Sequence, residues 1–154
     1  MEMPKPTDAH RRLDKLAGQW SGEEKIYPSP FDPQGGTAIA RLENRLALDG
    51  FAVVQDYEQE RNGKINFRGH SVFRYDAMQQ CYEIHWFDSM GFAPSVFRGN
   101  FDGDTLALVS QSPQGHNRAV YDFSKKGQYA FHMEVSPDGK QWFPFMDGQY
   151  SLKS

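Results

Sequence analysis

The sequence predicts an all-β fold, a closed up-and-down barrel of about ten antiparallel strands with one short N-terminal helix. Turn signals recur about every 11 to 13 residues through most of the chain, a spacing typical of consecutive antiparallel hairpins. The 154 residues also include 12 Phe, 7 Tyr and 3 Trp in an otherwise polar composition, which suits strands with one buried and one wet face. Closure is favoured because an open sheet of this size would leave two edges unpaired.

The helical pattern covers residues 7–18, TDAHRRLDKLAG. Thr7 or Asp8 supplies the N-cap and Gly18 ends the helix, which makes it about three turns long. Because Trp20 follows at once between two glycines, we expect the helix to close one end of the barrel, with Trp20 packed beneath it as a plug. The apolar face of the helix consists of Ala9, Leu13, Leu16 and Ala17.

The strands follow in order between the turn signals. The first, GQWSGEEKI, begins at Gly18 and leads into YPSPFDPQGG at residues 27–36, a stretch rich in Pro and Gly that is suited to a lid. Each later strand is bounded by a short turn that contains Gly, Asn, Asp or Pro. These turns lie at Asp49-Gly50, Asn62-Gly63, 76–80, 91–94, Asp102-Gly103, 113–115, Lys126-Gly127 and Asp138-Gly139.

Alternation assigns an inner and an outer face to every strand, because successive strand residues point to opposite sides. With the bulkier face taken as the inner one, the interior mixes aromatic side chains with a few polar groups. This mixture is typical of a pocket for a small, largely apolar molecule. The alternative is that these side chains fill the core against each other. The inward residues predicted to bind a ligand are Trp20, Glu24, Tyr57, Phe73, Trp86, Tyr121, Met133 and Trp142.

Glu24 stands out in this set because a buried carboxylate is costly unless it is paired, so it needs a nearby cation or must be protonated. Arg98 and Arg118 are the candidate partners. Alternation places both outward, but each lies near a glycine or a turn, where the strand register can slip. An inward arginine would also bind a ligand carboxylate. The sequence leaves the orientation of both arginines open.

A further group of candidate binding residues follows Trp86 at the end of its strand. Asp88, Ser89 and Met90 supply two polar side chains and a flexible thioether there. We expect them to line the rim of the cavity. The alternative is a local bulge that requires Gly91.

Several segments resemble known barrels. LAGQWSGE at 16–23 resembles the Gly-x-Trp opening of lipocalin-like, calycin-type barrels. HWFDSMG at 85–91, GNFDGDTLAL at 99–108 and SPDGKQWFPFMDGQY at 136–150 are similar to an uncharacterised bacterial family of such barrels, the domain-of-unknown-function family numbered fifteen seventy-nine. The resemblance implies an up-and-down antiparallel β-barrel over nearly the whole chain. It implies no activity, because that family has no established one.

Composition predicts one cytoplasmic domain over residues 1–154. The net charge is −3 and both signs are interspersed, so the sequence does not indicate a basic patch that would bind nucleic acid. The longest apolar run, FAVV at 51–54, is far too short to insert into a membrane. The single cysteine, Cys81, and an opening without an apolar signal-peptide core favour a reducing compartment.

No metal or cofactor is predicted. Haem would need an inward histidine as axial ligand, whereas His70, His85 and His132 are all assigned to the outer face. Ser71 in GHSVF lacks the second glycine of a nucleophile elbow. The acidic turn FDGDT lacks the glutamate that completes a calcium loop.

The function that the sequence favours is non-covalent binding of a small hydrophobic or amphipathic molecule in the barrel, without a metal and without catalysis. Two alternatives stay open. One is an enzyme that acts on a small apolar substrate in the same cavity, with Glu24 or Asp88 as base. The other is a self-associating module, such as a homodimer formed through the outward Phe87, Phe143 and Phe145.

Overall fold

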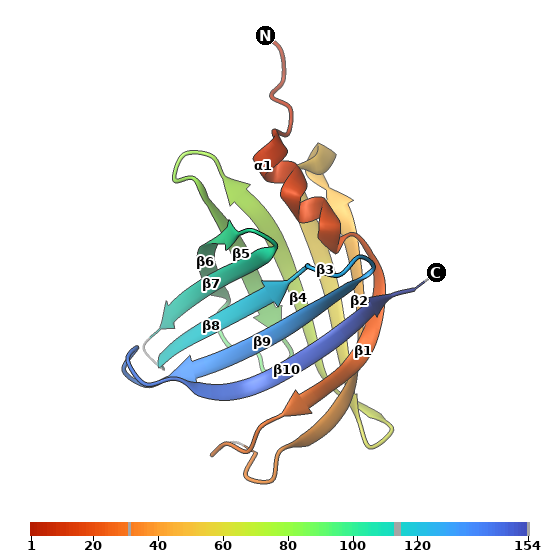
Figure 1. The fold of residues 1–154 in the computed structure, drawn as a ribbon, viewed down its shortest axis with the longest axis vertical. Coiled ribbons are helices and arrows are strands. Elements are labelled where there is room, and N and C mark those ends of the chain that lie inside the picture. The colour runs from red at the N-terminus through yellow and green to blue at the C-terminus, as the bar shows by residue number, and fades with distance from the viewer. Residues whose placement is uncertain (31, 113–114, 154) are drawn as a thin grey trace.

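The computed structural model describes residues 1–30, 32–112 and 115–153. Its strands form a closed antiparallel barrel in the order β1-β10-β9-β8-β7-β6-β5-β4-β3-β2 (Figure 1). The predicted fold class is thus confirmed. The predicted turn at 113–115 and the predicted lid at 27–36 lie in part outside the described residues. No helix within the described ranges is long and apolar enough to span a bilayer.

Each strand pairs with its neighbours in sequence, and β1 also pairs with β10 to close the barrel. The strand lengths follow the spacing of the turn residues. The strands are β1 (Gly18–Ile26), β2 (Gly36–Ala47), β3 (Ala52–Arg61), β4 (Lys64–Asp76), β5 (Cys81–Asp88), β6 (Ser95–Asp102), β7 (Thr105–Ser112), β8 (Gly115–Asp122), β9 (Gln128–Ser136) and β10 (Phe143–Leu152).

The N-terminal helix is shorter than predicted. It consists of one α-helical turn, α1 (Asp8–Arg11), followed by a 3₁₀ segment, η1 (Arg12–Leu16). The reason lies at the Leu16 carbonyl, which accepts hydrogen bonds from Trp20 Nε1 at 2.8 Å and Asn44 Nδ2 at 2.9 Å. These side chains satisfy the end of the segment, so the chain turns directly into β1.

The α1–η1 segment lies across one end of the barrel (Figure 1). Leu13, Leu16 and Trp20 are buried there in the same apolar cluster, as the plug interpretation predicts. The segment is also tied to the far wall, because Tyr82 donates a hydrogen bond to the Ala9 carbonyl at 2.6 Å. We call this the helix end and the opposite end, which carries no helix in Figure 1, the open end.

Glycine at one position of β1 permits a very close contact with β10. A Cβ atom built on Gly22 would lie 1.7 Å from the backbone oxygen of Gln149. No side chain fits at that distance, so the two strands approach each other at the closing seam only because residue 22 is glycine.

Two β-bulges change the faces that simple alternation assigns. One lies in the β3–β4 pair between Gln59 and Glu60, and the other in the β9–β10 pair between Pro144 and Met146. Each bulge adds a residue to one strand, so the residues beyond it exchange faces. The second bulge places Phe143 opposite Val135, an alignment that strict alternation along β10 does not give.

His10 of α1 is a buried histidine that should make folding depend on pH. Its Nδ1 accepts a hydrogen bond from the Thr7 backbone N–H at 3.0 Å, and its ring packs edge-on against Phe51 and Tyr75. Burial first, and the Arg11 and Arg74 charges next, lower the pKa of His10 below its ordinary value of 6.5.

We therefore expect acid to destabilise the fold through His10. The unfolded chain takes up a proton below about pH 6.5 that the folded chain resists, so the free energy of unfolding falls as pH falls. Urea unfolding on either side of that pH should show a larger loss for the wild type than for His10→Phe. An equal loss in both proteins would show that His10 titrates alike in both states.

Candidate functional site: the open half of the barrel

The barrel interior divides into two halves that differ in packing. In the half next to the helix end, most inward side chains are buried, although Tyr75 and Phe101 beside α1 and η1 keep part of their surface exposed. Toward the open end, inward aromatic and thioether side chains keep part of their surface exposed, even at mid-strand positions of β9. The sealed residues include Leu16, Trp20, Val53, Phe73, Leu106, Leu108 and Tyr121. The half-buried inward residues of the open half are Phe67, Trp86, Phe131, Met133 and Met146.

Two aromatic rings form one wall of the open half. Trp86 stacks on Phe67 with ring centroids 6.4 Å apart and meets Tyr57 edge-on at 6.0 Å. The Trp86 ring lies over Gly69, where a Cβ atom would come within 2.3 Å of it. Asp88 fixes the indole by accepting a hydrogen bond from Trp86 Nε1 at 2.7 Å. The ring is therefore held in place by Phe67 and Gly69 of β4, by Tyr57 of β3 and by Asp88 of its own strand.

Beneath this wall lies a buried carboxylate cluster, which consists of Glu24, Tyr57, Gln59 and Tyr150. Tyr57 donates to both carboxylate oxygens of Glu24 at 2.7 Å, and Tyr150 donates to Oε2 at 2.6 Å. Gln59 Nε2 donates to Oε1 at 2.9 Å. Glu24 is only 1% exposed, yet two hydroxyls and one amide aim hydrogens at it, an arrangement that suits a carboxylate as acceptor.

Small residues make room for this cluster on the neighbouring strands. Ala38 of β2 and Gly148 of β10 are the cross-strand partners of Glu24. A Cβ atom on Gly148 would lie 2.3 Å from the Tyr150 hydroxyl, so the absence of a side chain at residue 148 lets that hydroxyl reach Glu24.

The tyrosines of the cluster are held in their protonated, donating form. Burial first, and the neighbouring Glu24 charge next, raise the pKa of Tyr57 and of Tyr150 above the ordinary value of 10.0. Both hydroxyls therefore keep their protons at neutral pH and continue to donate to Glu24.

The structure does not bring Arg98 or Arg118 to Glu24. Arg98 lies on the outer face and pairs through Nε with Glu83 Oε2 at 2.7 Å. Arg118 is also outward and pairs through Nε with Glu134 at 2.9 Å. The two arginines follow plain alternation, and the expectation that Glu24 takes one of them as partner is wrong. Neutral donors satisfy Glu24 instead.

Trp142 also departs from its predicted inward position. Its ring lies beneath the guanidinium of Arg118, which is 4.3 Å from the ring centroid on the outer face. The cause is that Trp142 precedes the first residue of β10 and lies beyond the bulge at Pro144/Met146. The face inferred from Met146 by alternation therefore does not extend to Trp142.

The remaining predicted site residues fall into two groups. Trp20, Phe73 and Tyr121 are buried toward the helix end. Ser89 and Met90 lie at the rim, where Ser89 Oγ accepts a hydrogen bond from the Arg68 backbone at 2.9 Å and Met90 is exposed. Of the predicted set, the structure brings together Glu24, Tyr57, Trp86, Asp88 and Met133 in or beside the open half.

Two residues of the carboxylate cluster were not predicted, namely Gln59 and Tyr150. Alternation continued two residues beyond Tyr57 would have placed Gln59 inward. For Tyr150, the signal was the same alternation on β10 counted from Met146, which gives 148 and 150 as inward positions.

The strand histidines lie on the outer face, as alternation predicts. His70 pairs with Asp56 at 2.7 Å, and His85 lies 3.2 Å from Glu83. His132 bonds to Asp147. Each imidazole is thus oriented by an outer-face carboxylate rather than toward the interior.

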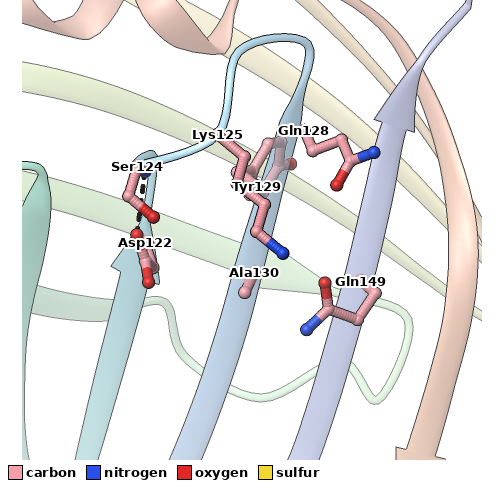
Figure 2. A pocket seen from close by; sticks show the side chains of 7 residues that line it. All are labelled: Asp122, Ser124, Lys125, Gln128, Tyr129, Ala130 and Gln149. Atoms are coloured by element: carbon pink, nitrogen blue, oxygen red, sulfur yellow. Dashed lines mark hydrogen bonds between the residues drawn. The ribbon is translucent and has the colours of Figure 1, made fainter.

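The outer face carries two shallow depressions. Figure 2 shows the smaller, of about 110 Å³, beside the turn between β8 and β9. A larger one, of about 410 Å³, shares three of its residues and extends toward the middle of β9 and β10. The shared residues are Asp122, Ala130 and Gln149. A small molecule could also bind in these depressions. Any binding experiment therefore has to distinguish binding there from binding in the interior.

Comparison with known proteins agrees with the fold. The family model described as "Protein of unknown function (DUF1579)" matches residues 5–151. No curated protein matches the chain. Among solved structures, Rv2717c from M. tuberculosis is similar with a TM-score of 0.75 and 12% identity, over 96% of this chain and 99% of that chain.

An S-type phycobiliprotein lyase, CPES from Guillardia theta, is similar with a TM-score of 0.62 and 8% identity, over 97% of this chain and 99% of that chain. At such identities, both likenesses show the barrel fold alone.

Proposed function

We propose a binding function on the premise that the chain belongs to the DUF1579 family of proteins of unknown function. The barrel binds a small, largely apolar molecule in its open half. The observation that carries the proposal is the partial exposure of inward apolar side chains. Phe67, Trp86, Met133 and Met146 face the interior and are only half-buried, and they lie toward the end of the barrel opposite α1 and η1. A bound apolar molecule would remove that surface from water.

The fold also favours this place. The mouths of β-barrels are among the sites where small-molecule pockets recur, with mostly apolar walls and a few polar groups that fix orientation. Here the walls are aromatic and thioether side chains, and the polar groups are Asp88 at the mouth and the carboxylate cluster below it. The solved structures with similar folds add no ligand to this argument.

Binding is favoured over catalysis because of how Glu24 is held. A general base needs to reach the proton that it abstracts. The hydroxyls of Tyr57 and Tyr150 and the amide of Gln59 occupy the carboxylate oxygens instead. Asp88 is likewise engaged, since it accepts hydrogen bonds from Trp86 Nε1 and the Met90 backbone.

The proposal predicts saturable, one-to-one binding of the neutral dye N-phenyl-1-naphthylamine, measured by its fluorescence. Met133→Trp should weaken binding by at least about tenfold, equivalent to roughly 1.4 kcal/mol, because the larger ring fills the open half. Thermal unfolding should stay cooperative, since filling a real space costs less than overpacking a full core.

The matched control is Ala130→Trp on the same strand. Ala130 lines both outer depressions, so this variant blocks them and leaves the interior unchanged. Dye binding that survives Met133→Trp but is lost in Ala130→Trp would move the site to the outer face. No saturable binding by the wild type would refute the proposal.

A further inference from the structure

We infer that the ligand of the open half carries a cationic nitrogen, as an organic ammonium or a protonated nitrogen ring does, on an apolar body. This inference rests on the proposed binding function and specifies its ligand class. It follows from the charge of the interior, from what occupies the space beside Glu24, and from the nature of the wall.

Arg61, two residues after Gln59 on β3, reaches the inner face at the open end, where it lies beside Gly36 and pairs with Asp32 at 2.6 Å. Glu24 and Asp88 are the carboxylates of the site, and none of the ion pairs among the described residues includes either of them. Arg98 and Arg118 are committed to acids on the outer face. Hydrogen bonds from neutral groups satisfy the oxygens of Glu24, and a cation placed beside them would form stronger, charge-assisted hydrogen bonds with the same oxygens.

Gln59 marks where such a cation would bind. Its Nε2 donates to Glu24 Oε1 at 2.9 Å and to the Tyr57 hydroxyl at 3.0 Å, and it also lies 3.8 Å from the Met146 sulfur. An N–H donor thus already occupies the point where the open half meets the carboxylate. A ligand ammonium that displaced the Gln59 amide would form the same hydrogen bonds with charge assistance, while Tyr57 and Tyr150 continue to donate to Oε2.

The wall above this point suits a cation as well. Trp86, Phe67 and Tyr57 form one aromatic wall of the open half, and Asp88 holds the Trp86 indole in place. The negative face of an aromatic ring attracts an organic cation, with tryptophan the strongest of the three. Carboxylate ligands meet the opposite conditions, because Glu24 and Asp88 face them and Arg61 at the mouth is already paired with Asp32.

The experiment compares three displacers of the bound dye at neutral pH, namely octylamine, octanol and octanoate. They carry apolar chains of nearly equal length on a cationic, a neutral and an anionic head group, since the amine stays protonated below about pH 10. We expect octylamine to bind about tenfold more tightly than octanol, and octanoate to bind more weakly than octanol. Equal affinity of the three, or preference for octanoate, would overturn the inference while the proposed binding function stands.

Variants then locate the charge that is responsible. Glu24→Gln should reduce the preference for the amine to less than about threefold, a loss of roughly 0.7 kcal/mol or more. Glu23→Gln is the matched control, because Glu23 is exposed on the opposite face of the same strand, and it should leave the preference unchanged.

An undiminished preference in Glu24→Gln would overturn the assignment to Glu24. Should that variant fail to fold, the three displacers on the wild-type protein still decide whether the ligand is cationic. Absence of dye binding by the wild type would refute the binding function itself, and this inference with it.

Discussion

Replacing Trp20 by Ala should lower the free energy of unfolding by about 3–5 kcal/mol, the usual cost of cutting a buried aromatic residue to alanine. Trp20 packs edge-on against Tyr129 with ring centroids 4.8 Å apart, beneath η1. The variant also loses the hydrogen bond from the indole to the Leu16 carbonyl, which helps to end η1. Urea unfolding followed by far-UV circular dichroism measures the effect.

Trp142→Ala is the matched control because Trp142 lies on the outer face against Arg118. Loss of an exposed cation–π contact costs only about 0.5–1 kcal/mol. Unfolding midpoints that shift equally in the two variants would show that Trp20 does not close the barrel.

The second large effect is expected for Glu24→Leu. Leucine has a similar size, but it accepts no hydrogen bond, so the Tyr57 and Tyr150 hydroxyls and the Gln59 amide lose their acceptor inside the barrel. Each unsatisfied buried donor costs about 1–3 kcal/mol, and with some relaxation the total loss should reach about 2–5 kcal/mol. The free energy of unfolding from urea titration checks this value.

Glu24→Gln serves as the comparison for that variant. Its side-chain carbonyl still accepts a hydrogen bond, so the loss of stability should be smaller than for leucine. A Glu24→Leu protein as stable as the wild type would show that the cluster relaxes freely, as replacement of a buried charge by an apolar residue sometimes permits. The carboxylate would then have no structural role.

The sequence was sufficient to predict the barrel because its signals are local and repeated. Glycine and asparagine turns set the strand lengths, and alternation placed Trp86, Tyr57 and Met133 inward without knowledge of the partners. The helix was overestimated because its C-terminal end depends on Asn44, which lies far away in the sequence and satisfies the Leu16 carbonyl.

The site was only partly predictable for a similar reason. Period-two alternation fails across a bulge, and the bulge in β10 moved Trp142 to the outer face. The cluster around Glu24 joins residues of β1, β3 and β10, and only the closed barrel brings them together. An arginine partner was expected because charge is read from the sequence more easily than the convergence of neutral donors.

The closing seam has a consequence for folding kinetics. Every strand pairing except β1 with β10 joins sequence neighbours and can form as a local hairpin, whereas the seam aligns Trp20 with Leu152. Pairing these two segments costs the entropy of closing a loop that spans almost the entire chain. Until that event, β1 and β10 are bare sheet edges in the nascent protein, open to pairing with a second copy. Local hairpins can therefore form early, but the edges of β1 and β10, which are prone to aggregation, are covered last.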